Sequence, residues 1–189
     1  MVRNGKSSWQ ALGCLVVLVW AGLVGTATAA EPAQKGPPQK LRVVVFGAHC
    51  DEATVKAVGD WLGEVKPDVV VAHWPLDTHP NHNVSSALVW QNYARKGGWN
   101  LYFFEVMTDQ QSIGFRPDLY LDIATVRDQK RHVLEADKSQ GPEAIWQCHD
   151  AMHRRRGAEC GVQFAEAYWL VEAKPGAALL PVAFLPRKQ

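Results

Sequence analysis

The feature that most constrains this chain is a pair of apolar, β-branched runs joined by one helical pattern. Leu41–Phe46 (LRVVVF) and Val69–Ala72 (VVVA) have the composition of strands buried on both faces, as in parallel sheets. Between them, Ala53–Glu64 carries apolar residues at helical spacing, and a Lys66-Pro67-Asp68 turn ends the helix. Strand, helix and strand in this order form a βαβ unit, so the sequence predicts an α/β fold.

The alternation continues along the rest of the chain, which predicts a Rossmann-like fold: an open, mostly parallel sheet flanked by helices. We expect a helix at Val84–Arg95, strands at Leu101–Val106 and Leu119–Ile123, charged amphipathic helices at Thr125–Lys138 and Glu143–Arg156, and, between Phe164 and Phe184, a helix containing Trp169 followed by a strand at Leu179–Phe184. In the Thr125–Lys138 helix, Val126 and Val133 are expected to face inward and Arg127 outward.

Residues 1–30 have the features of a secretory signal peptide. Arg3 and Lys6 precede the apolar run Ala11–Gly25, and Ala27-Thr28-Ala29 fits a cleavage site near Ala29/Ala30. The alternative is an uncleaved membrane anchor, but the run is short for a span of about 20 residues. We expect a protein exported to the periplasm or the extracellular space, with no stable membrane span after cleavage, a disordered leader at 31–40 and one domain at 41–189.

The net charge bears on which partners the chain can bind, and the cysteine content bears on whether it can form a disulfide. The chain has 20 Lys and Arg and 19 Asp and Glu; losing Arg3 and Lys6 leaves 18 against 19, a formal charge of −1. Such a chain has no net positive charge to hold phosphate backbones, which argues against nucleic acid as a partner. Export would permit a disulfide between Cys148 and Cys160, with Cys50 as the odd thiol.

Two polar loops follow the predicted strands of the βαβ unit. Gly47–Glu52 (GAHCDE) comes directly after the first strand, and Asp77–His82 (DTHPNH) comes just after the second. In open parallel sheets, ligands bind outside the carboxyl ends of the strands, and a βαβ crossover places successive strands near each other. We therefore expect both loops to meet at one edge of the sheet.

The side chains of these loops are the ones that a catalytic zinc site uses. Such a site takes three His or carboxylate ligands and keeps a fourth position for water. His49, Glu52 and His82 can supply the ligands. Asp51 would take a proton from the bound water, and His79 would donate a proton to the leaving amine or stabilise the oxyanion.

Asp77 lies two residues before His79, where it could hold the imidazole in one tautomer and raise its pKa. Zinc (Zn2+) is the expected metal, and another divalent metal is the alternative. A single loop carboxylate is usually only solvated, and a histidine near a strand end is usually packed. Two such loops at one functional edge favour a metal site.

These two loops resemble motifs of the PIG-L/LmbE family. His49-Cys50-Asp51-Glu52 is similar to its Ala-His-Pro-Asp-Asp segment, and Asp77–His82 to its Asp-x-His-Pro-Asp-His segment. The resemblance implies a Rossmann-like fold and zinc-dependent hydrolysis of a linear amide C–N bond, removing the acetyl group from an N-acetylglucosamine-type sugar or glycoconjugate. It matches His49, Glu52 and His82 to metal ligands, Asp51 to the general base, and His79 to the electrostatic or acid histidine.

Three departures from the family pattern bear on activity. Glu52 stands where the family has an aspartate ligand, so its carboxylate reaches one methylene further. Cys50 replaces a proline and places a soft thiol beside the site. Thirty residues separate His49 from His79, where family members have a long segment with further strands. The chain is therefore shortened, and the alternative is a non-catalytic family member that binds metal or a partner.

Three other features have competing interpretations. Cys148, His149, His153 and Cys160 form either a second metal cluster or a helix face. The basic run Arg154-Arg155-Arg156 is either a solvated helix end or an anion site. Trp74 either stacks on a sugar or packs in the core.

Overall fold

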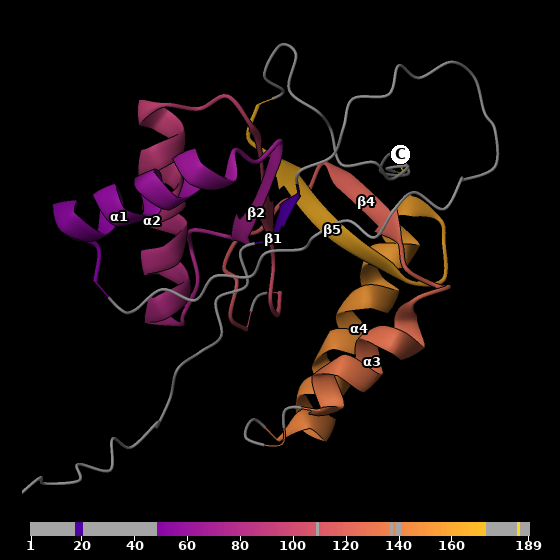
Figure 1. Ribbon diagram of the computed structural model, residues 1–189. Coiled ribbons are helices and arrows are strands. Elements are labelled where there is room, and N and C mark those ends of the chain that lie inside the picture. Colours follow the sequence, from indigo (N-terminus) through magenta and orange to yellow (C-terminus); the bar gives the residue numbers. More distant parts are fainter. Residues whose placement is uncertain are drawn as a thin grey trace, which may run out of the picture.

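The computed structural model describes residues 18–20, 49–108, 110–136, 138, 141–172 and 185, with the backbone alone at 18–20. Five strands form one open sheet in the order β1-β2-β3-β5-β4, and helices flank it (Figure 1). The strands are β1 (Leu18–Trp20), β2 (Val69–His73), β3 (Asn100–Phe104), β4 (Leu119–Asp122) and β5 (Ala165–Leu170). The helices are α1 (Glu52–Val65), α2 (Pro80–Arg95), α3 (Arg127–Ala136) and α4 (Pro142–Cys160). The predicted α/β class, with an open sheet flanked by helices, is confirmed.

The described sheet is mixed in direction. β2 and β3 are parallel, with His73 beside Phe104, whereas β5 is antiparallel to both β3 and β4, and β1 is antiparallel to β2. The cause for β5 is the pair of helices between β4 and β5. α3 leads away from the sheet and α4 returns to it (Figure 1), so the chain re-enters at the edge it left and must run in the opposite direction. The expectation of a mostly parallel sheet does not hold for the described strands.

β1 lies within the segment for which the sequence predicts a signal peptide, and it pairs with β2 from Leu18–Val71 to Trp20–Val69. The predicted strand Leu41–Phe46, the cleavage site and the leader lie outside the described residues, so export and cleavage stay predictions. Among the described residues, no helix has the length and apolarity that crossing a membrane requires.

The segment after α4 is a strand where the sequence predicted a helix. In β5, Ala165 and Ala167 are buried on one face of the sheet, while Glu166 and Tyr168 alternate with them. β4 pairs with Ala165–Tyr168 and β3 pairs with Tyr168–Leu170, so every residue of β5 pairs with at least one neighbouring strand. Tertiary pairing therefore overrides the local helical preference of its alanines. The predicted strand Leu179–Phe184 lies outside the described residues, although Leu185 pairs with Tyr120.

α1 and α2 pack on one side of β2 and β3, and α1 lies across α2 in Figure 1 rather than alongside it. The crossing point is close, because a Cβ on Gly59 would lie 2.3 Å from Oδ1 of Asn92. The same amide donates through Nδ2 to the carbonyl groups of Val55 and Leu88, so it joins the two helices. The core here comprises Val55, Val58, Leu62, Val70, Ala72, Leu88, Val89, Tyr93, Trp99, Leu101 and Phe103.

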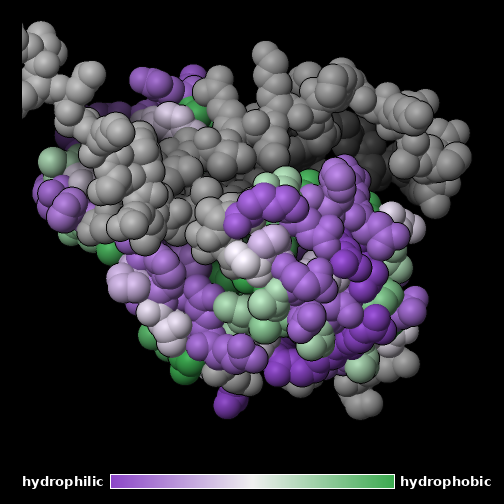
Figure 2. All heavy atoms as spheres, turned by 90° about the horizontal axis from the view of Figure 1, so that it is seen from below, coloured by the Kyte–Doolittle hydropathy of each residue, from purple (hydrophilic) through white to green (hydrophobic). Residues whose placement is uncertain are grey.

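α3 buries no residue completely, and its predicted faces are reversed. Val126, just before α3, and Val133 are exposed, whereas the guanidinium of Arg127 lies over Trp146 and pairs with Asp150. The hydrocarbon stem of an arginine packs well while its charged end finds a carboxylate, which explains the reversal. Hydrophilic residues predominate over the described part of the face shown in Figure 2.

Candidate functional site

A buried carboxylate lies at the centre of the polar residues that follow β2. Asp77 accepts hydrogen bonds from the backbone N–H of His79 (2.9 Å) and from Ser112 Oγ (3.0 Å), and its Oδ1 lies 3.1 Å from His82 Nδ1. Burial alone would raise the pKa of Asp77, but the hydrogen bonds from His82, the His79 backbone and Ser112 outweigh it and hold the pKa below its usual value. Asp77 is therefore ionised. The sequence predicted that it would hold the His79 imidazole, but its carboxylate contacts the ring of His82 and only the backbone of His79.

The ionised Asp77 fixes the tautomer of His82. Only a protonated Nδ1 can donate to a carboxylate, so a neutral His82 has its lone pair on Nε2. The structure places Nε2 of Gln111 3.2 Å from Nδ1. A protonated Nδ1 cannot accept from it, so this tautomer requires the amide to be turned with its oxygen toward Nδ1, and the two ends of an amide are interchangeable in assignment. His82 is thus oriented with Nε2 as an acceptor that no described residue occupies, the arrangement found in both general bases and metal ligands.

Three imidazole rings stack beside this carboxylate. His82 lies between His79, at 4.6 Å between centroids, and His73, at 3.9 Å and 9° from parallel. Burial, followed by the nearby His82, lowers the pKa of His73 to about 3, so His73 is neutral at physiological pH. His73, the last residue of β2, was not among the predicted site residues; a polar residue that ends an otherwise apolar strand was the available signal.

The loop after β3 ties these groups together. The backbone N–H of Thr78 donates to Gln111, and that of Ile113 donates to Leu76, so the loops after β2 and β3 are paired. Ser112 Oγ accepts from the N–H of Val106 while it donates to Asp77. Because β2 and β3 are parallel neighbours, both loops leave the same edge of the sheet, which is the edge that the sequence predicted for a site.

Arg156 supports the loop after β3 from α4. It is buried and bonds to Glu105 through Nε (2.6 Å) and Nη2 (2.7 Å), and to Glu159 through Nη1 (2.8 and 2.9 Å). Thr108, in the loop, also donates to Glu105. Both carboxylates already occupy this guanidinium, and Arg154 pairs with Asp150. Arg156 is therefore not an anion site, whereas Arg154 and Arg155 are exposed, as a solvated helix end requires.

The first predicted loop lies elsewhere. Asp51 is exposed and caps α1 by accepting from Thr54 N (2.8 Å) and Oγ1 (2.7 Å), and these bonds lower the pKa of Asp51. Glu52 forms a two-pronged ion pair with Arg95, at 2.8 and 3.0 Å, which lowers the pKa of Glu52. His49 is exposed. The loop therefore lies against the carboxyl end of α2.

The structure does not bring the two predicted loops together. Arg95 follows His82 by 13 residues on α2, which at 1.5 Å per residue is roughly 20 Å along the helix. The orphaned Nδ1 atoms of His73 and His79 show spare ligand capacity near His82, but no described carboxylate or thiol completes a set. Within the described ranges, no three His, Cys, Asp or Glu residues form a metal-binding group. As placed, His49, Glu52 and His82 do not fit one metal ion.

The second predicted cluster on α4 is also not a metal site in the described structure. His153 is fully buried, and its Nε2 lies 2.8 Å from Lys130 Nζ, which also donates to Glu166. Cys148 and Cys160 are free and lie on the same helix, 12 residues and roughly 18 Å apart. A disulfide needs Cα atoms within about 7 Å, so these two cannot form one in this fold.

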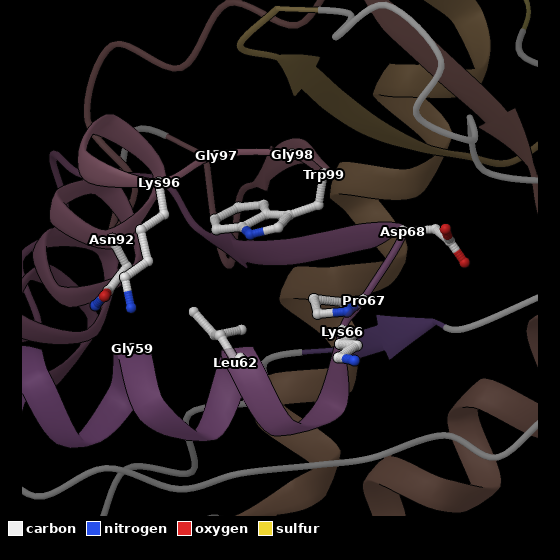
Figure 3. A pocket seen from close by; sticks show the side chains of 11 residues that line it. Gly59, Leu62, Lys66, Pro67, Asp68, Asn92, Lys96, Gly97, Gly98 and Trp99 are labelled. Atoms are coloured by element: carbon white, nitrogen blue, oxygen red, sulfur yellow. The ribbon is translucent and has the colours of Figure 1, made fainter.

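Two cavities of about 350 Å³ lie on the described surface. One, at the carboxyl end of α1, is lined by Lys66, Lys96, Asp68 and Trp99 among others (Figure 3). It sits at the amino ends of β2 and β3, away from the edge where open α/β sheets bind ligands. The other includes Trp74 and Asn83 and therefore adjoins the histidine stack.

Comparison with known proteins places the fold. Two solved structures are similar over most of this chain. The conserved protein TT1542 from Thermus thermophilus is 25% identical, and the match covers 71% of this chain and 64% of that chain with a TM-score of 0.53. The 4-carboxy-2-hydroxymuconate hydratase GalB from Pseudomonas putida is 20% identical, and the match covers 70% of this chain and 63% of that chain with a TM-score of 0.54. N,N'-diacetylchitobiose deacetylase from Pyrococcus horikoshii is also similar: it is 18% identical, and the match covers 65% of this chain and 52% of that chain with a TM-score of 0.53. No family profile and no curated protein matches the chain.

These similarities confirm the resemblance to LmbE/PIG-L-type proteins at the level of the fold. The chain spans less than two thirds of the length of each of these three relatives.

Proposed function

We propose that this chain is a hydrolase of the deacetylase type that cleaves the amide bond of an N-acylated substrate at the edge formed by β2 and β3. The observation that carries the proposal is the buried Asp77–His82 pair, which leaves His82 Nε2 without a hydrogen-bond partner among the described residues at that edge. A fold shared with proteins that include a deacetylase supports the same reaction class.

The geometry suits proton transfer by His82. Nε2 takes a proton from a water molecule as the water oxygen attacks the amide carbonyl carbon. The imidazolium that forms is stabilised by the Asp77 carboxylate at 3.1 Å. His82 then returns the proton to the amine nitrogen as the C–N bond breaks, giving an amine and a carboxylic acid. The role proposed for His79, whose ring stacks on that of His82 at 4.6 Å between centroids, is to stabilise the oxyanion or to donate a proton to the leaving amine.

An N-acetylated sugar or glycoconjugate is the substrate class that we propose, on the resemblance to a diacetylchitobiose deacetylase. Zinc or another divalent metal belongs to the sequence prediction alone. Glu52 is held by Arg95 and lies far from His82, so the predicted metal ligands do not meet at one point. Metal content measured after purification, with and without added Zn2+, tests that part of the prediction separately.

The test is release of acetate from chitobiose-type and N-acetylglucosamine glycoconjugates. We expect His82→Ala and Asp77→Asn to lower kcat by roughly 10²- to 10⁴-fold, since each removes the oriented base. Replacing the exposed His132 on α3 by alanine is the matched control and should change kcat less than twofold. A chain that releases acetate equally well without His82 would contradict the proposal.

The second candidate is a non-catalytic protein of this fold that binds a metal or a partner. The observation that favours it is the separation of Asp51 and Glu52 from His82. It predicts no acetate release from any N-acetylated substrate at any concentration of added Zn2+. Measurable turnover that depends on His82 would exclude it.

A further inference from the structure

The cavity beside the histidine stack has walls that are aromatic and uncharged. It has a volume of about 350 Å³ and lies between α2, the loop after β2, and strands β3 and β5. Its lining residues are Trp74, Pro75, Asn83, Ser86, Ala87, Trp90, Phe103 and Trp169. Because none carries a charge, the cavity suits an uncharged group.

The aromatic rings form flat surfaces around this space. Trp74 packs edge-on against Phe103 and Trp169, at 6.2 and 5.5 Å between centroids, while Phe103 and Trp169 stack at 6.0 Å with 15° between their planes. Trp90, on α2, is 44% exposed and closes one side. Rings in edge-on and stacked arrangements favour a flat apolar ligand.

One buried hydroxyl group among the lining side chains is unpaired within the described structure. Ser86 is fully buried, and its hydroxyl has no hydrogen-bond partner in the part of the chain that the structure describes. Both ends of the Asn83 amide are engaged, because Oδ1 accepts from Asp77 N and Nδ2 donates to Asp77 O. The indole N–H of Trp74 donates to the carbonyl of Ile113.

We propose that this cavity binds an aromatic ring bearing one hydroxyl or carbonyl group, which pairs with Ser86 Oγ. A pyranose ring is a poorer match, since it brings several hydroxyl groups to a lining that is mostly aromatic and apolar. Asn83 lines the cavity and also donates a hydrogen bond to the backbone of Asp77, so a ring bound here lies beside the histidine stack. Where the ring is part of the acylated substrate, the inference rests on the proposed function.

Binding can be measured by 19F NMR on the full chain labelled with 5-fluorotryptophan, with phenol, toluene and N-acetylglucosamine as probes. We expect phenol to shift the resonances of Trp74, Trp90 and Trp169, assigned by Trp→Phe variants, and to leave Trp61 and Trp146 unchanged. Phenol should bind roughly three- to tenfold more tightly than toluene, the value of one hydrogen bond.

Ser86→Ala should abolish the preference for phenol over toluene. The matched control is Ser85→Ala, because the Ser85 hydroxyl bonds to the carbonyls of Asn81 and His82 and does not line the cavity. Equal binding of phenol and toluene, a preference that survives Ser86→Ala, absence of shifts at the three tryptophans, or tighter binding of N-acetylglucosamine would each overturn the inference.

The inference and the proposed function fail separately. Ring binding is read without turnover, and His82→Ala should bind phenol as the unmodified chain does, because His82 does not line the cavity. Binding of phenol without acetate release would leave the cavity assignment standing and remove the hydrolase proposal.

Discussion

At the scale of single residues, Arg156 is a buried cation that neutralises two carboxylates. It is 4% exposed and lies between Glu105 and Glu159. Burial alone would lower the pKa of this guanidinium, but the two carboxylates raise it above its ordinary value. Through Glu105 and Thr108, Arg156 reaches the loop that carries Gln111 and Ser112, so it is a positioning residue for the Asp77–His82 pair.

We predict that Arg156→Ala lowers the free energy of unfolding by about 3–5 kcal/mol, because Glu105 is then left charged and buried without its partner. Urea unfolding followed by circular dichroism measures the change. Arg154→Ala is the control: Arg154 is 55% exposed and pairs with Asp150 one helical turn away, so its loss should cost no more than about 0.5 kcal/mol. Similar losses in the two variants would contradict this account.

At the scale of elements, the contact between α1 and α2 is set by a glycine. Gly59 lets the Asn92 amide approach α1 closely enough to bond to Val55 O at 3.0 Å. That crossing also directs the start of α1 toward the carboxyl end of α2, where Arg95 holds Glu52. The position of the first predicted loop is therefore a consequence of helix packing.

We predict that Gly59→Ala destabilises the fold by about 1–3 kcal/mol, since the new Cβ would lie 2.3 Å from Asn92 Oδ1 and displace the buried amide that bonds to Val55 and Leu88. Gly63→Ala is a matched change on the same helix, where a Cβ meets nothing within 4 Å. It should stabilise the protein by up to about 1 kcal/mol through helix propensity. Thermal unfolding of both variants measures the two changes in stability. Changes of the same sign in both variants would contradict this prediction.

At the scale of the whole molecule, buried neutral histidines make stability depend on pH. Burial, followed by the ammonium of Lys130, lowers the pKa of His149 to about 4 and that of His153 to about 3; Glu166 opposes both shifts. Between pH 6.5 and these values the unfolded chain binds protons that the folded chain does not. Burying these neutral imidazoles therefore does not lower the free energy of unfolding above pH 6.5, but lowers it increasingly as the pH falls below that value.

We expect the free energy of unfolding to fall by up to about 1.4 kcal/mol per pH unit for each of these two histidines between pH 6.5 and 5. Urea unfolding at half-unit steps gives the slope. His153→Gln should reduce the slope by about one proton, whereas His132→Gln, at an exposed position of α3, should leave it unchanged. A slope that is unaffected by His153→Gln would refute the assignment.

The parts of the fold predicted well from sequence are those whose pattern is local. The runs that form α1, β2 and α2 carry their own periodicity, and Asp77–His82 follows β2 as its position implied. β5 was assigned as a helix because its pairing with β3 and β4 comes from distant residues. The distance between Glu52 and His82 also depends on the angle at which α1 crosses α2, which no residue pattern encodes.

Asn83 gives the molecule a means of thermodynamic linkage. One amide holds the backbone of Asp77 from both sides and also forms a wall of the aromatic cavity. A ligand in the cavity that shifts Asn83 must shift Asp77 with it, and so alters the orientation of His82. By reciprocity, such a ligand would couple the two places, and a ligand bound at His82 would change the affinity of the cavity by the same factor.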